Sequence, residues 1–150
     1  MSLGPEEQRT LASVLDTILP PSKQGQRAGA GGLGLVNHIQ EVLAESPIMQ
    51  PIIASGLAAA QAAARRRGAG DFETLPQDAR QRILEEISAE QPDLLPSLTF
   101  HGYVGYYQHP DVIQTLGLEP RPPHPKGYEI EESDLSLLDP VRARPKLYRE

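Results

Sequence analysis

The stretch LLPSLTFHGYVGYYQHPDVIQTLG, residues 94–117, decides the fold of this chain and holds four of its seven aromatic residues. On a helical wheel at about 100° per residue, its apolar side chains occupy two faces, separated only by a narrow polar strip. One face carries Phe100, Tyr103, Val104 and Tyr107, the other carries Leu94, Leu95, Leu98, Gly102, Gly105 and Tyr106, and the strip is Ser97, His101 and Gln108. Because a helix that is apolar nearly all round is a buried one, we predict a buried central helix at about residues 93–108.

Four segments before this stretch have apolar residues at helical spacing, so we predict that they are helices. They are residues 5–19, residues 35–45, residues 47–67 and a segment that Thr74 caps, with Gln77 at the capping-box position. Pro110 to Leu116 adds a short helical turn, and Gly117 ends it. The predicted fold is therefore all-α: a single-domain bundle of about five helices packed around the central one, spanning residues 1–117.

From residue 118 on, prolines are frequent and apolar residues lose their periodicity. Such a segment cannot readily offset the entropy of ordering its own backbone. We therefore predict that residues 118–150 form an extended Pro-rich arm, laid over the domain or over a partner, with one helical turn at residues 133–138. Tyr128 and Tyr148 are the candidate anchor points of this arm.

Charge and composition exclude several classes of function. The net charge of −6 argues against nucleic acid and anionic lipid as partners, and the absence of cysteine excludes disulfides and thiolate metal sites. Arg65, Arg66 and Arg67 could form an anion patch, but we favour cations at the negative end of a helix dipole. No segment has the length of a membrane span, and no twin-arginine or secretory signal is visible. We expect a cytoplasmic protein, or a periplasmic one if a signal preceded this chain.

Residues 22–34 are rich in glycine, and Gly29, Gly31 and Gly34 match the pattern G-x-G-x-x-G. In nucleotide-binding proteins such glycines follow a strand and let backbone N–H groups approach a phosphate. Here a helix and two prolines precede the pattern, so we interpret the segment as a flexible connector. Asp16 is placed unfavourably for the dipole of its helix, which suggests that it accepts a hydrogen bond from a nearby backbone N–H.

No combination of residues predicts a catalytic, cofactor-binding or metal site. There is no G-x-S-x-G, no H-E-x-x-H and no carboxylate at ligand spacing from His101 or His109. His101 is interpreted as a structural histidine, and Tyr103, Tyr106 and Tyr107 as core aromatics. The alternative is a pocket near His101 in which these tyrosines stack on a sugar or a flavin.

Three motifs together resemble a known family. The first is LDTILPP at residues 15–21 followed by the glycine-rich loop, and the second is F-x-x-L-x-x-x-x-R at Phe72, Leu75 and Arg80, leading into RILEEI. The third is LTFHGYVGYYQHP at residues 98–110, followed by LGLEP. Over residues 10–118 the chain resembles the gluconate 2-dehydrogenase subunit 3 family.

This resemblance implies a small helical accessory subunit without a cofactor. Its partner would be a large FAD-dependent dehydrogenase of the glucose–methanol–choline type that acts on sugars or polyols, often joined by a cytochrome subunit. Typical members carry a twin-arginine signal and help the large subunit mature and be exported. This chain differs from them, because no such signal is visible in its sequence. The resemblance implies no catalytic residue.

Two functions of different classes follow. The first is an interaction protein that binds and stabilises a flavin-dependent dehydrogenase. Its candidate partner-binding residues are Ser97, His101, Tyr106, Tyr107, Tyr128 and Tyr148. The second is a stand-alone small-molecule-binding protein or enzyme that uses the pocket near His101. The sequence leaves open whether the chain forms a homo-oligomer.

Overall fold

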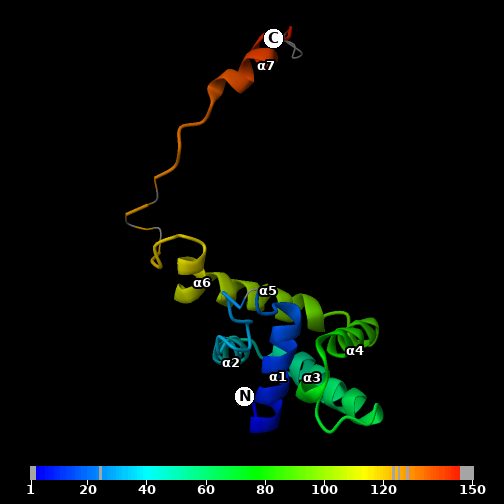
Figure 1. The fold of residues 1–150 in the computed structure, drawn as a ribbon. Helices are drawn as coiled ribbons and strands as arrows, with labels where there is room; N and C mark the ends of the chain where they lie inside the picture. Colours follow the sequence, from blue (N-terminus) through cyan, green and yellow to red (C-terminus); the bar gives the residue numbers. More distant parts are fainter. Residues whose placement is uncertain (1–2, 24, 123, 125, 128, 146–150) are drawn as a thin grey trace. The chain divides into compact units, whose positions relative to one another are not determined.

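The computed structural model describes residues 3–23, 25–122, 124, 126–127 and 129–145, and their regular elements are all helical (Figure 1). The α-helices are α1 (Pro5–Ile18), α2 (Val36–Glu45), α3 (Met49–Arg66), α4 (Gln77–Glu90), α5 (Leu94–Gln108), α6 (Pro110–Thr115) and α7 (Asp139–Arg142), and the 3₁₀ turns are η1 (Phe72–Thr74) and η2 (Leu135–Leu138). This confirms the all-α prediction. The chain divides into two compact units, Met1–Pro120 and Arg121–Glu150.

The first unit is a helical bundle in which α5 contacts α1, α2, α3, α4 and α6. The central position predicted for this helix is therefore confirmed. Helix α1 also contacts α2, α3, α4 and η1, so α1 and α5 each contact most of the other helices of the bundle. The largest fully buried apolar side chains come from every major helix: Leu11, Leu15, Ile39, Leu43, Ile53, Phe72, Ile83, Leu94 and Leu98.

Helix α5 is buried on only one of its two apolar faces, which corrects the prediction of a helix buried all round. Its buried residues are Leu94, Leu98, Gly102 and Tyr106. On the opposite face, Phe100, Tyr103 and Tyr107 are exposed to 64%, 45% and 51%. Helical periodicity reports that a face is apolar, but a bundle of this size has too few elements to cover both faces of α5.

Thr74 does not cap α4, contrary to the prediction. Its hydroxyl donates to the carbonyl of Asp71 at 2.7 Å inside η1, and the residue before α4 is Pro76 in an extended conformation. A proline disfavours helical backbone in the residue that precedes it, so Leu75 stays extended and the helix begins only at Gln77.

Two glycines on α5 differ in what a methyl group would meet. An alanine Cβ at Gly102 would lie 3.7 Å from the side chains of Leu15 and Leu19, which is ordinary contact. At Gly105 it would lie 2.6 Å from the Cδ2 atom of His38, so the imidazole ring would have to move. The imidazole of His38 on α2 therefore packs closely against α5 at Gly105.

We expect opposite effects from alanine at these two positions. Gly102→Ala should raise the free energy of unfolding by up to about 1 kcal/mol, because alanine favours helix over glycine. Gly105→Ala should lower it by about 1 kcal/mol or more, because overpacking outweighs the gain in helix propensity. Urea unfolding followed by circular dichroism measures both. Equal shifts in the two variants would contradict the packing of His38 on Gly105.

Candidate partner-binding surface

The glycine-rich loop is fixed on both sides by residues of the first and third sequence motifs. A carboxylate oxygen of Asp16 accepts hydrogen bonds from the backbone N–H groups of Gly31 at 2.8 Å and Gly32 at 3.3 Å. From the other side, the hydroxyl of Tyr106 donates to the carbonyl of Ala28 at 3.1 Å. The predicted bond from Asp16 to a backbone N–H is thus confirmed, and its donors lie in the loop.

These contacts correct the interpretation of the loop as a flexible connector. Gly29 and Ala30 are buried, and the N–H of Ala30 donates to the carbonyl of Leu19 at 3.0 Å. A Cβ on Gly31 would collide with the backbone carbonyl of Ala12. The glycines therefore permit close approach to α1, and the two N–H groups that could cradle a phosphate are already bound to a carboxylate of the chain itself.

Because the side chain of Tyr106 is buried against the loop, three other aromatic side chains of α5 lie on its solvent-exposed side. We call Phe100, Tyr103 and Tyr107 the aromatic stripe, because their spacing of three and four residues places them on one side of the helix. The rings of Tyr103 and Tyr107 lie 5.9 Å apart, and Tyr107 packs edge-on against the buried ring of Tyr106 at 5.4 Å. Two rings of the stripe, Tyr103 and Tyr107, thus pack on one another, and Tyr107 also packs on the core.

The structure separates the residues that the sequence proposed for partner binding. Tyr107 lies on the surface, whereas Tyr106 is buried and bonded to the loop. Ser97 and His101 are half-buried. Tyr128 and Tyr148 lie outside the described residues. Sequence reasoning assigned Phe100 and Tyr103 to the core, although their spacing with Tyr107 already marked a single side of the helix.

His101 lies beside one aromatic ring and another histidine. The ring of Phe100 meets its imidazole edge-on at 5.0 Å. Burial lowers the pKa of His101, and the neighbouring His38 lowers it further. Both effects favour the neutral imidazole at neutral pH. Within the described part of the chain, no group of three or more metal-ligating side chains is placed to hold a metal ion.

Gln61 is a buried polar residue that sequence reasoning missed. Its amide nitrogen donates to Glu6 at 3.2 Å and to Asp71 at 2.6 Å, and its amide oxygen accepts from the backbone N–H of Phe72 at 2.9 Å. A cavity of about 260 Å³ opens beside it between α1 and α3. The polar groups that line this cavity are already paired, because Arg65 also binds Glu6 at 2.7 Å.

Two of the three arginines at the end of α3 form ion pairs within the bundle. Arg65 pairs with Glu6 on α1, and Arg67 pairs with Glu86 on α4 at 2.6 Å. The residues of the second motif are structural as well: Phe72 is fully buried, and Arg80 donates to the carbonyl of Ser13 at 3.5 Å. The ion pairs of Arg65 and Arg67 support the interpretation of these two arginines as structural cations.

Comparison with known proteins gives one result. The sequence profile of the family described as gluconate 2-dehydrogenase subunit 3 matches residues 5–121, which is most of the chain. No curated protein and no solved structure shows a significant match. Among the described residues, none of the helices combines the length and the apolar composition that crossing a membrane requires.

Proposed function

Because the chain belongs to the gluconate 2-dehydrogenase subunit 3 family, we propose that it is the non-catalytic accessory subunit of a flavin-dependent dehydrogenase. The family is that of an accessory subunit of a dehydrogenase complex. In our proposal the partner is a large flavoprotein of the glucose–methanol–choline type that oxidises a sugar or a polyol. The accessory subunit binds this partner and stabilises it or assists its maturation.

The observation that carries this proposal is the aromatic stripe. Large exposed apolar side chains that gather on one face mark interaction sites, and tyrosine and phenylalanine are enriched at the centres of protein–protein interfaces. The rings of Tyr103 and Tyr107 already pack on one another, so these two side chains lose little freedom on binding. Ser97 and His101, half-buried beside the stripe, supply hydrogen-bonding groups for the polar rim of such an interface.

The surroundings of His101 support a structural role over a catalytic one. A general base is expected to have a pKa near the working pH and a partner that orients it. His101 meets the ring of Phe100 and lies near the side chain of His38, and its pKa is lowered. These contacts favour the accessory subunit over a stand-alone enzyme.

Co-expression of the chain with the proteins of its adjacent genes, among which the proposal expects a large flavoprotein subunit, tests the proposal. We expect the two proteins to co-purify as a stable complex, and the large subunit to be less soluble and less heat-stable when it is expressed alone. The purified single chain should show no dehydrogenase turnover with sugars or polyols and an artificial electron acceptor. Turnover by the single chain, or a large subunit that remains separate and equally stable, would overturn the proposed function.

A further inference from the structure

The exposed side of α5 continues beyond the aromatic stripe to a carboxylate. Asp93 directly precedes α5 with helical dihedral angles, φ −84° and ψ −15°, and it lies seven residues before Phe100. Tyr107 lies seven residues after Phe100. Because seven residues make about two helical turns, the carboxylate and the two rings share one side of the helix. An acidic side chain therefore lies at one end of the stripe.

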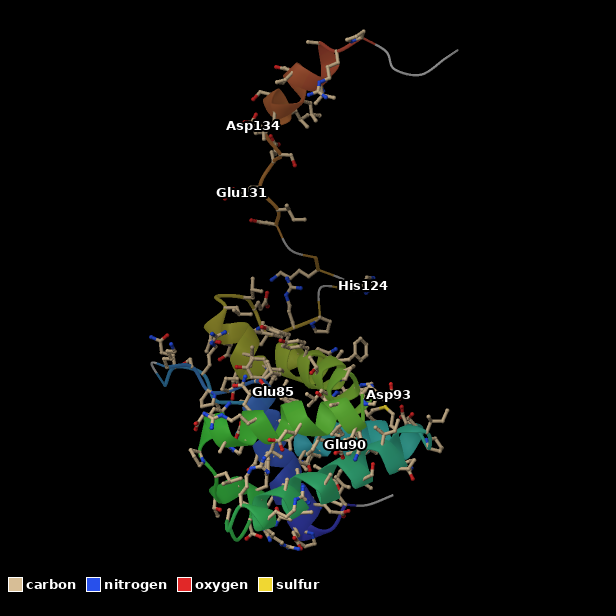
Figure 2. The ribbon with its side chains drawn as sticks, turned by 90° about the vertical axis from the view of Figure 1, so that its right-hand side faces the viewer. Glu85, Glu90, Asp93, His124, Glu131 and Asp134 are labelled. Carbon is tan, nitrogen blue, oxygen red and sulfur yellow. The ribbon has the colours of Figure 1, made fainter. Side chains whose placement is uncertain are left out.

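The carboxylates of Asp93 and of its neighbour Glu90 are not used by the bundle. Asp93 occupies the N-cap position of α5, but its side chain makes no capping hydrogen bond. Glu90 ends α4, and Figure 2 shows both side chains at the turn between α4 and α5. Among the described residues, neither exposed carboxylate has an ion-pair or hydrogen-bond partner, whereas Glu6, Glu73 and Glu86 each bind an arginine. We call Glu90 and Asp93 the acidic border.

The charge of the first unit limits what can bind to this surface. Residues 83–120 contain no lysine or arginine and six acidic residues: Glu85, Glu86, Glu90, Asp93, Asp111 and Glu119. Residues 1–120 hold 14 of the 20 acidic residues and 8 of the 14 basic ones, so this part of the chain carries a net charge of −6. A second copy of the chain would bring an equally acidic unit and is repelled, as is an anionic lipid surface. The charge favours a basic occupant.

We propose that the aromatic stripe and the acidic border together bind a basic segment of the large dehydrogenase subunit, in which arginine stands beside apolar side chains. The inference rests on the proposed function, because it specifies the chemistry of the partner at the same surface. Arginine suits both parts of the surface, since its guanidinium stacks on the face of an aromatic ring and forms paired hydrogen bonds with a carboxylate. Arginine and aromatic residues are also enriched at protein–protein interfaces.

Cross-linking within the purified complex identifies the bound segment. The complex is isolated through a tag on the large flavoprotein subunit, and Phe100→p-benzoylphenylalanine places a photo-reactive group at a side chain that is 64% exposed. We expect the cross-linked peptide to come from the large subunit and to contain more arginine and lysine than acidic residues. A peptide from a second copy of the chain, from residues 121–150 of the same chain, or from an acidic stretch of the large subunit would overturn the inference.

Neutralising the acidic border tests the contribution of its charges. The variant is Glu90→Gln with Asp93→Asn, and the matched control is Glu41→Gln with Glu45→Gln on α2, where both carboxylates are exposed and have no ion-pair partner among the described residues. At low salt we expect the border variant to associate with the large subunit at least about fivefold more slowly than the wild type and to depend less on salt. The control should stay within about twofold of the wild type. Equal effects in the two variants would show that net charge alone attracts the partner, which would contradict a local basic contact.

Phe100→Leu separates ring stacking from plain apolar contact. Leucine keeps an apolar side chain at this position but has no aromatic face that attracts a guanidinium. We expect the variant to dissociate from the large subunit about two- to fivefold faster than the wild type. Dissociation at the wild-type rate would show that Phe100 meets only apolar side chains and would overturn the stacking on which the inference depends.

The same measurements separate this inference from the proposed function. If the wild-type chain binds the large subunit, but the border variant and Phe100→Leu bind like the wild type, the basic segment is ruled out and the proposed function stands. If the wild-type chain does not bind the large subunit at all, both fail.

Discussion

Replacing Gly31 with alanine is expected to lower the free energy of unfolding by about 3 kcal/mol or more, although only one methyl group is added. The new Cβ would collide with the backbone carbonyl of Ala12 and with the carboxylate of Asp16. Ala12 lies inside α1, so its carbonyl cannot move away without distorting the helix on which the bundle is built. The loop must retreat instead, and Asp16 then loses its hydrogen bonds from the two glycines.

The neighbouring glycine provides the control for this prediction. At Gly32 the atom nearest to an added Cβ is 3.5 Å away, and this residue is exposed. Gly32→Ala should therefore change the free energy of unfolding by no more than about 0.5 kcal/mol. Chemical denaturation of both variants gives the two values. A loop that served only as a connector would tolerate both substitutions equally, and that result would contradict the fixed loop.

Removing the aromatic stripe should abolish partner binding without unfolding the protein. The triple variant Phe100→Ala, Tyr103→Ala, Tyr107→Ala is expected to weaken binding to the large subunit at least about a hundredfold, because a single aromatic hot spot often contributes 2 kcal/mol or more. All three side chains are exposed, so the midpoint of thermal unfolding should shift little. Titration calorimetry, or dissociation kinetics with the tagged large subunit, measures the loss.

Tyr106→Phe is the matched control for the stripe. It keeps the buried ring but removes the hydroxyl that donates to Ala28. We expect it to lower the free energy of unfolding by about 1 kcal/mol and to leave partner binding unchanged. The opposite pattern, weak binding by Tyr106→Phe and normal binding by the triple variant, would place the interface elsewhere on the molecule.

The sequence predicted the helices and the position of α5 because both depend on local patterns. Apolar spacing and proline breaks define α1, and Gly117 ends the short helix after α5 with a positive φ of 76°. The bond of Asp16 was predictable for the same reason, since an acidic side chain near the end of a helix is unfavourable unless a donor meets it. The pattern could not identify that donor, which is the N–H of Gly31, 15 residues further along the chain.

The candidate surface was predicted only in part, because periodicity does not distinguish a face covered by the same chain from one covered by a partner. Phe100, Tyr103 and Tyr107 were assigned to the core by the same rule that correctly placed Leu98 there, although Tyr107 was also named as a candidate partner contact. Gln61 was missed because its neighbours in an alanine-rich helix give no sign that its amide will bind Glu6 and Asp71, which lie in two other segments.

The contacts of α1 have a consequence for the order in which the protein folds as it leaves the ribosome. Several hydrogen bonds of α1 and of the loop after it need donors that are synthesised later. Glu6 accepts from Gln61, the carbonyl of Ser13 accepts from Arg80, and the loop accepts from Tyr106. At about 5–20 residues per second, the roughly 90 residues between the end of α1 and the end of α5 take about 5–20 s to synthesise. The apolar side of α1 has no complete set of partners during that interval, so the nascent chain exposes a binding site for chaperones before the bundle can close.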